Sequence, residues 1–157
     1  MVVNLRVDER LIHGQVVTSW LKSLNVSRIV VANDAAAKDE IQKMSLLMAV
    51  PAGQKCMVAD MESAIKVLND PRGESIRMLV VCDSPYDALE LVKNVKGITE
   101  VNLVNYGSLV GSSSKRKQYA KGLFLDDNDM QCIQDLIAAG ATVYNQSLPD
   151  NPKKKIV

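Results

Sequence analysis

The feature that most constrains the fold of this chain is an alternation between short β-branched runs and longer stretches of helical pattern. Arg28–Ala32 (RIVVA) is apolar enough to be buried on both faces, as strands of parallel sheets are, and Ile76–Cys82 (IRMLVVC) is another clear strand. Between such runs, apolar residues recur at helical spacing. Repeated strand–helix units predict an α/β fold in three layers, with a mostly parallel central sheet of about seven strands and helices on both faces.

The expected strands follow one another along the whole chain. They are Val2–Val7, Arg28–Ala32, Cys56–Ala59, Ile76–Cys82, Glu100–Val104, Leu123–Leu125 and Thr142–Tyr144. Right-handed crossovers are expected between parallel strands. Because no linker divides the sequence, we expect residues 1–157 to form a single domain.

Several of the helices expected between these strands carry start or stop signals. Ser84 followed by Pro85 is typical of a helix N-terminus. Asp60 is a candidate cap of an earlier helix, and Asp126 or Asp127 is a candidate cap of the last one. Two polar segments are expected to lie outside the regular elements: a solvated loop over residues 112–117 and a frayed tail over residues 149–157.

Two apolar stripes indicate amphipathic helices in the first third of the chain. One follows the only histidine and the other is stopped by Pro51 and Gly53. The stripes consist of Val16, Val17, Trp20 and Leu24, and of Ile41, Met44, Leu47 and Met48. Aromatic residues make up only 4% of the chain, so the core must come from aliphatic side chains and methionine. We therefore expect Trp20 and the methionines to be buried.

Charge and cysteine content argue against several classes of protein. The 19 basic and 18 acidic residues give a formal net charge of +1, which argues against nucleic acid as an obligate partner. The three cysteines are far apart and form no C-x-x-C motif, so we expect no disulfide, no metal site and no cofactor. No signal peptide or membrane-spanning run is visible, and we expect a cytoplasmic protein without direct membrane insertion.

The segment Arg6–Gln15 (RVDERLIHGQ) holds the only histidine, His13. In α/β folds, ligands bind beyond the carboxyl ends of the strands. A helix beginning near Gly14–Gln15 would place His13 at a helix N-terminus, where free backbone N–H groups favour an anion. Because Gly14 has no side chain, an anion on the imidazole could approach the backbone closely.

This arrangement predicts a site for a phosphoryl group on His13. Neutral imidazole is a good nucleophile near pH 7, and Asp8 or a backbone carbonyl could hold its second nitrogen. Arg6 and Arg10 would stabilise charge on the phosphoryl oxygens. In a second interpretation His13 is only a partly buried cap or packing residue. The two arginines would then be surface partners of Asp8 and Glu9.

The sequence RVDERLIHGQV resembles a family signature at every fixed position. The signature, R-[IV]-D-x-R-L-[IV]-H-G-Q-V, belongs to the IIB components of the mannose/fructose/sorbose family of the bacterial phosphoenolpyruvate-dependent sugar phosphotransferase system (PTS). The resemblance continues through IVVANDAAAKD, VPAGQKCMV, LVVCDSPYDALELV and DLIAAGATVYNQSLPD, and so spans nearly the whole chain. It departs where the family commonly has Asn-Val-Gly-Gly-Met, because this chain has NYGSL at residues 105–109.

The resemblance implies a phosphocarrier, a protein-Nπ-phosphohistidine–sugar phosphotransferase. In this family the IIB histidine accepts a phosphoryl group on Nδ1 from the phosphohistidine of a IIA domain. It then hands the group to a sugar held by the membrane IIC/IID complex, at the inner face of the cell membrane. His13 maps onto that histidine, and Asp8 and Arg10 map onto its supports. On our own interpretation, Gly14 and Gln15 add backbone N–H groups.

Other functions and other sites stay open at this point. A non-catalytic α/β module that binds an anion or nucleotide would need His13 only as a structural residue. A serine or cysteine hydrolase is not supported, since no G-x-S-x-G elbow is present. Asn33–Asp34 and Asp83–Ser84 fit either pocket lining or turn and cap chemistry. Residues 106–108 could wrap a phosphate, or Gly107 could simply supply a positive φ.

Overall fold

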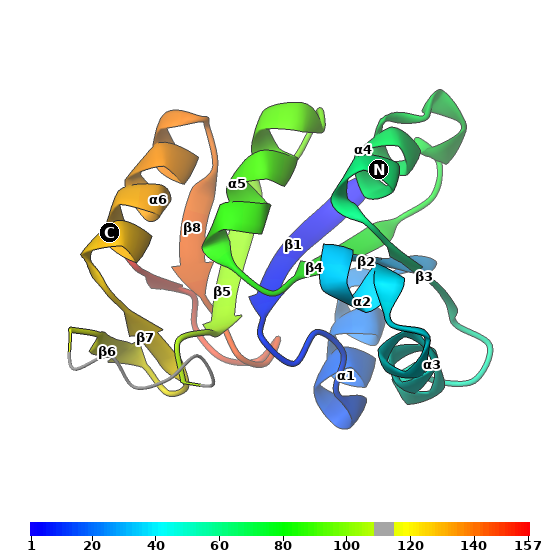
Figure 1. Cartoon of the computed structure of the whole chain (residues 1–157), viewed down its shortest axis with the longest axis horizontal. Coiled ribbons are helices and arrows are strands. Elements are labelled where there is room, and N and C mark those ends of the chain that lie inside the picture. Colours follow the sequence, from blue (N-terminus) through cyan, green and yellow to red (C-terminus); the bar gives the residue numbers. More distant parts are fainter. Residues whose placement is uncertain (109–114) are drawn as a thin grey trace.

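A seven-stranded sheet forms the centre of the computed structural model, which describes residues 1–108 and 115–157 except for the side chains of Gln15 and Val16 (Figure 1). The strand order is β3-β2-β4-β1-β5-β8-β9. The strands are β1 (Val2–Asp8), β2 (Arg28–Ala32), β3 (Lys55–Ala59), β4 (Met78–Cys82), β5 (Glu100–Asn105), β8 (Thr142–Asn145) and β9 (Lys154–Lys155). All neighbouring pairs are parallel except β8 and β9. The mostly parallel sheet is therefore confirmed.

Helices cover both faces of this sheet, as expected. They are α1 (Gly14–Leu24), α2 (Asp34–Lys38), α3 (Glu40–Ala49), α4 (Met61–Asn69), α5 (Pro85–Asn94) and α6 (Asp127–Ala138), with a short 3-10 turn η1 at Pro71–Gly73. One core joins α4, α5 and α6 to the sheet and includes Leu5 and Val7 of β1. The other core joins α1, α2 and α3 to the opposite face and includes Ile29 and Val31 of β2.

Side-chain caps precede five of the helices. Each cap accepts a hydrogen bond from the backbone N–H three residues on; the caps are Asn33, Asp39, Asp60, Ser84 and Asp126. Asn33 is thus a helix cap, and Asp126 rather than Asp127 caps α6. Gly140, with φ +100°, follows the end of α6.

Two predictions about strands are wrong in part. Leu123–Leu125 is a strand (β7), but it pairs with β6 (Lys117–Ala120) in a separate antiparallel hairpin. The seventh strand of the main sheet is instead β9, in the tail that was expected to fray. Lysines suit an edge strand, and the ammonium of Lys154 donates to the carbonyl of Tyr119 at 2.6 Å. Lys117, expected in a solvated loop, begins β6, and residues 112–114 of that loop lie outside the described residues.

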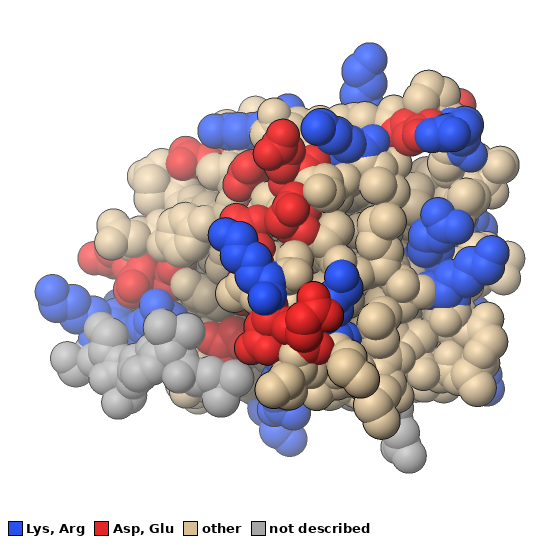
Figure 2. All heavy atoms as spheres, turned by 45° about the vertical axis from the view of Figure 1, so that its right-hand side comes forward, with Lys and Arg blue, Asp and Glu red and all other residues tan. Residues whose placement is uncertain are grey.

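The apolar stripe of α3 faces solvent, which contradicts the prediction that its methionines are buried. Its exposed side chains are Ile41, Met44, Leu47 and Met48, and Met48 is 81% exposed. Because α3 packs against α2 and the edge strand β3, it buries Leu46 instead. Figure 2, in which the α3 side of the molecule comes forward, shows broad uncharged areas between interspersed acidic and basic groups.

Candidate functional site

Strand β1 carries polar side chains on one face and apolar ones on the other. Leu5 and Val7 belong to the core under α4, α5 and α6. Successive side chains of a strand point to opposite faces, so Asn4, Arg6 and Asp8 face the α1 side. All three are buried. The interpretation of Arg6 as a surface partner is therefore wrong. The signal that could have shown it was the expectation of helices on both faces of the sheet, since polar–apolar alternation alone indicates a strand with one solvent-exposed face.

The carboxylate of Asp8 is the centre of the site. Its Oδ2 accepts hydrogen bonds from Arg6 Nη2 at 3.1 Å and Asn105 Nδ2 at 3.1 Å, and lies 3.0 Å from His13 Nε2. Its Oδ1 accepts from the backbone N–H of Arg10 at 3.0 Å. One buried carboxylate thus connects the β1–α1 loop, the Arg6 side chain of β1 and the end of β5. Sequence reasoning placed Asp8 beside His13 but did not identify the role of Asn105.

The imidazole of His13 lies at the N-terminus of α1, as predicted. His13 occupies the N-cap position in an extended conformation, but its side chain makes no capping hydrogen bond. Its side chain is 27% exposed, so it is neither sealed in the core nor fully solvated. Because a carboxylate only accepts hydrogen bonds, Nε2 carries the proton that faces Asp8, and in the neutral ring Nδ1 then carries the lone pair.

The first turn of α1 supplies backbone N–H groups that have no partner within the helix. Gly14 has φ +23°, and a Cβ built on it meets no atom within 4 Å in the described structure. The space beside its backbone is therefore open, as expected for close approach of an anion. Gln15 follows in the helix, and its side chain lies outside the described part of the structure.

Arg6 is a buried cation. Its side chain is 2% exposed, and its Nε and Nη1 have no hydrogen-bond partner among the described residues. Burial lowers the pKa of its guanidinium, and the nearby carboxylate of Asp8 opposes that shift. Since arginine stays protonated in proteins, Arg6 contributes a fixed positive charge below the site.

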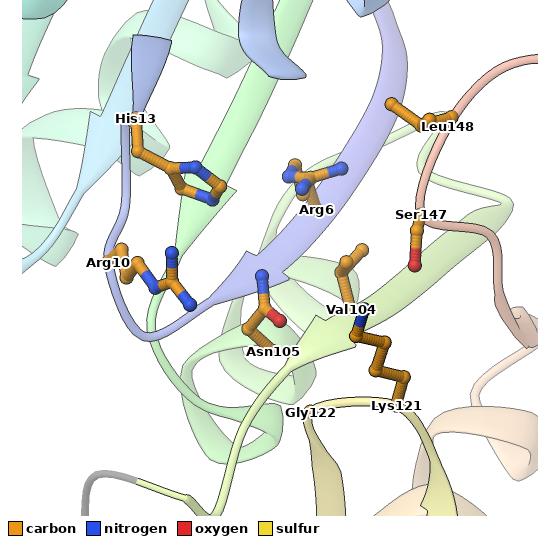
Figure 3. A pocket seen from close by; sticks show the side chains of 9 residues that line it. All are labelled: Arg6, Arg10, His13, Val104, Asn105, Lys121, Gly122, Ser147 and Leu148. Atoms are coloured by element: carbon orange, nitrogen blue, oxygen red, sulfur yellow. The ribbon is translucent and has the colours of Figure 1, made fainter. Parts of the chain in front are cut away.

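A cavity of about 430 Å³ opens beside His13 at the carboxyl ends of β1 and β5 (Figure 3). Its lining residues are Arg6, Arg10, His13, Val104, Asn105, Lys121, Gly122, Ser147 and Leu148. These come from strands β1 and β5, the β1–α1 loop, the turn of the β6–β7 hairpin and the segment after β8. The indole N–H of the buried Trp20 donates to the carbonyl of Ser147 at 2.9 Å, which ties α1 to that segment. Three cations and no carboxylate line the cavity in the described structure.

The segment after β5 is joined to the β1–α1 loop through Glu9. The backbone N–H of Glu9 donates to the carbonyl of Asn105 at 2.8 Å, and the carboxylate of Glu9 accepts from Gly107 N–H at 2.8 Å. Gly107 has φ +88°, which confirms that it supplies a positive φ. Its N–H is directed to Glu9 rather than to a phosphate. Leu109 lies outside the described residues.

The other strand-end pairs do not contribute to this cavity. Asp34 accepts a hydrogen bond from the backbone N–H of Met61, and Ser84 caps α5. Burial and the neighbouring Asp83 raise the pKa of Asp87 to about 7. In the described residues these groups lie outside the lining of the cavity beside His13.

Across the described residues, no helix has both the length and the apolar character required to span a bilayer. In the same part of the chain, no group of His, Cys, Asp or Glu side chains could hold a metal ion. Burial raises the pKa of the Cys56 and Cys132 thiols to about 11.

The doubly covered parallel sheet, with a histidine and a cation-lined cavity at its first crossover, defines an α/β domain with a ligand site at the carboxyl ends of its strands. Comparison with known families makes the assignment specific. The model of the PTS system sorbose subfamily IIB component matches residues 2–157, and the chain belongs to that family.

Relatives and solved structures agree with this assignment. The chain is 41% identical over 155 residues to the "Probable phosphotransferase enzyme IIB component" of Streptococcus pyogenes serotype M6, covering 98% of this chain and 95% of that protein. It is 34% identical to the PTS system mannose-specific EIIAB component of Escherichia coli K12, covering all of this chain but 48% of that protein. The IIBSor domain of the sorbose permease from Klebsiella pneumoniae superposes with a TM-score of 0.89 at 29% identity, covering 99% of this chain and 93% of that one.

Proposed function

We propose that this chain is the phosphocarrier of a sugar uptake system and that His13 carries the phosphoryl group. The donor is the phosphohistidine of a IIA domain, and the acceptor is a sugar held by a membrane IIC/IID complex. Residues 1–157 act as one IIB domain, in the cytoplasm and against the inner face of the membrane. The observation that carries the proposal is the imidazole at the start of α1, with Nε2 bonded to buried Asp8 and Nδ1 bearing the lone pair.

The chemistry of the first transfer follows from that geometry. The Nδ1 lone pair of His13 attacks phosphorus, so an N–P bond forms on His13 while the donor's N–P bond breaks. The proton on Nε2 stays in place, facing Asp8, and the resulting positive charge on the ring is stabilised by that carboxylate. In the second transfer a sugar hydroxyl attacks phosphorus, so an O–P bond forms while the N–P bond to His13 breaks. The hydroxyl proton passes to solvent, and His13 leaves as neutral imidazole.

Each neighbour of His13 has a separate part in this proposal. Asp8 fixes the tautomer and orientation of the ring, and Arg6 compensates the buried charge of Asp8. Arg10, which lines the cavity beside His13, and the N–H groups of Gly14 and Gln15, which lie at the positive end of α1, receive the phosphoryl oxygens.

The partner assignment has support from the relatives. The mannose-specific relative is an EIIAB component and therefore joins a IIA and a IIB part in one chain. For this chain we infer a IIA domain as donor on the same grounds. A partner must reach the imidazole directly, which its 27% exposure allows.

Phosphorylation in vitro tests the proposal. The protein is incubated with phosphoenolpyruvate and the upstream relay proteins, including a cognate IIA. We expect a covalent phosphate that is labile to acid, stable to alkali and absent from His13→Ala, whose folding is checked by Trp20 fluorescence. A phosphate that is stable to acid, or that persists in His13→Ala, would contradict the proposal. Anion binding that survives in His13→Gln without any covalent label would favour the non-catalytic binding module.

A further inference from the structure

The turn of the β6–β7 hairpin brings a cation into the cavity from the side opposite His13. Lys121 and Gly122 form this turn, and both line the cavity. Figure 3 shows the Lys121 side chain reaching from the hairpin toward the cavity, while His13 and Arg10 lie across from it. The hairpin is separate from the main sheet, and the site motif around His13 does not include it.

The position of this turn is fixed by contacts with the end of β5. The backbone N–H of Tyr106 donates to the carbonyl of Gly122 at 3.0 Å, and Phe124 N–H donates to the carbonyl of Tyr106 at 2.8 Å. Gly122 has φ +77°, and a Cβ there would lie 2.6 Å from Asn105 Oδ1. The turn therefore packs directly on Asn105, whose amide donates to Asp8. Lys121 is thus held in a defined place relative to the support of His13.

Two of the cations that line the cavity are available to bind a phosphoryl group. Arg6 is paired with Asp8. Within the described part of the chain, neither Arg10 nor Lys121 forms an ion pair, although both line the cavity. A phosphoryl group brings roughly two negative charges near pH 7. Two unpaired cations on opposite sides therefore match the charge that would arrive.

A role in transfer fits Lys121 better than a role in stability. Its side chain is exposed and makes no hydrogen bond with the described residues, so its removal costs the fold little. Phosphoryl transfer passes through a loose transition state with charge spread over the equatorial oxygens, and cations placed around those oxygens stabilise it. A lysine ammonium is a compact point charge on a flexible stem and can follow the oxygens as phosphorus moves.

We propose that Lys121 is a catalytic residue of the transfer, with its ammonium group contacting a phosphoryl oxygen while the group moves onto or off His13. Lys121 keeps its proton throughout, and the N–P bonds form and break as described above. This inference rests on the proposed function of His13. It assigns a task to the hairpin, which supplies the cation that faces Arg10.

Single-turnover transfer from phosphorylated IIA tests the inference, with Lys121→Met compared with Lys117→Met. Lys117 is exposed on β6 of the same hairpin and lies outside the cavity lining. We expect Lys121→Met to slow transfer at saturating donor roughly 10–100-fold, below the loss seen for a fully enclosed oxyanion donor. Lys121→Arg should restore most of the rate, and Lys117→Met should behave like the unmodified protein.

Two results would overturn the assignment. One is an unchanged rate at saturating donor in Lys121→Met. The other is a change only in the concentration of phosphorylated IIA that gives half of the maximal rate. That result would mean that Lys121 contacts the partner protein and not the phosphoryl group.

A second measurement separates failure of this inference from failure of the proposed function. The unphosphorylated protein is titrated with inorganic phosphate while the His13 imidazole is followed by NMR. We expect Lys121→Met, but not Lys117→Met, to weaken phosphate binding roughly 3–10-fold, as one exposed cation is lost. If Lys121→Met binds phosphate more weakly but His13 never becomes phosphorylated, the proposed function fails, while the contact of Lys121 with the anion is supported. If phosphate binding is equal in both variants, the contact of Lys121 with the phosphoryl group is refuted.

Discussion

Replacement of Asp8 by asparagine should weaken the fold and the site together. The substitution keeps the shape of the side chain and removes its charge. If the amide oxygen takes the place of Oδ2, the amide NH₂ faces the backbone N–H of Arg10, where two donors meet. If the amide is turned over, its NH₂ faces the three donors that now bind Oδ2. Neither orientation satisfies the buried groups.

The size of the effect follows from the burial of the pair. Arg6 and Asp8 are both almost fully buried, and the asparagine would leave the Arg6 guanidinium without a counter-charge. Removal of one partner from a buried ion pair costs about 3–5 kcal/mol. We therefore expect the free energy of unfolding to fall by about that amount, and the melting temperature by roughly 6–20 °C for a chain of this size. Loss of the correct imidazole tautomer should slow phosphoryl transfer by roughly 10²–10⁴-fold.

Three measurements check this expectation. Urea unfolding is followed through Trp20, the only tryptophan, which is buried between α1 and the segment after β8. Nitrogen NMR of His13 reports which ring nitrogen carries the proton, and single-turnover transfer reports the rate. Asp127→Asn, in the first turn of α6, is the matched control and should cost less than about 1 kcal/mol.

The assigned role of Asp8 would be refuted if Asp8→Asn unfolded at the same urea concentration as the control. It would also be refuted if the proton stayed on Nε2 of His13 and the transfer rate were unchanged. In that case the buried carboxylate would not be what fixes the ring.

Three further predictions concern other parts of the molecule. Gly122→Ala should lower stability by about 1–3 kcal/mol, measured by urea unfolding, because its φ is +77° and the new methyl group would meet Asn105 Oδ1. Asp87 has its pKa raised to about 7 from 3.8, chiefly by burial, with Asp83, Glu90 and Asp34 adding to the shift. Its native state therefore binds the proton more tightly than the unfolded state, and stability falls as pH rises from about 4 to 7. Asp87→Asn should remove that loss and raise the melting temperature at pH 8 but not at pH 4; equal shifts at both pH values would contradict this. Leu46→Ala should cost about 2–4 kcal/mol and Met48→Lys less than about 0.5 kcal/mol, because only the former side chain is buried; similar losses in both variants would refute the assigned orientation of α3.

The sheet, its crossovers and the place of His13 could be predicted because they depend on local patterns. Runs such as Arg28–Ala32 are buried on both faces, and the caps Asp60 and Ser84 act within three residues. A histidine before a glycine at the end of the first strand is likewise a local feature. These elements needed no knowledge of distant contacts.

The remaining parts depend on contacts between distant segments. Asn105 meets Asp8 across 97 residues of sequence, and Lys121 reaches the cavity through a hairpin whose first strand, β6, was not among the expected strands. The apolar stripe on α3 has the helical spacing of a buried face, but the spacing does not show whether another element packs against that face. Beyond the edge strand β3 this helix buries Leu46 and leaves Met48 exposed.

The oxygen that Asp8 shares among three donors has a consequence for how variants of this site combine. Arg6, His13 and Asn105 all bond to the same Oδ2, so each alters the acceptor that the other two use. Double-mutant cycles among these positions should therefore show epistasis rather than independent contributions. The triad will behave energetically as one unit, in which a loss at one position changes the cost of a loss at the next.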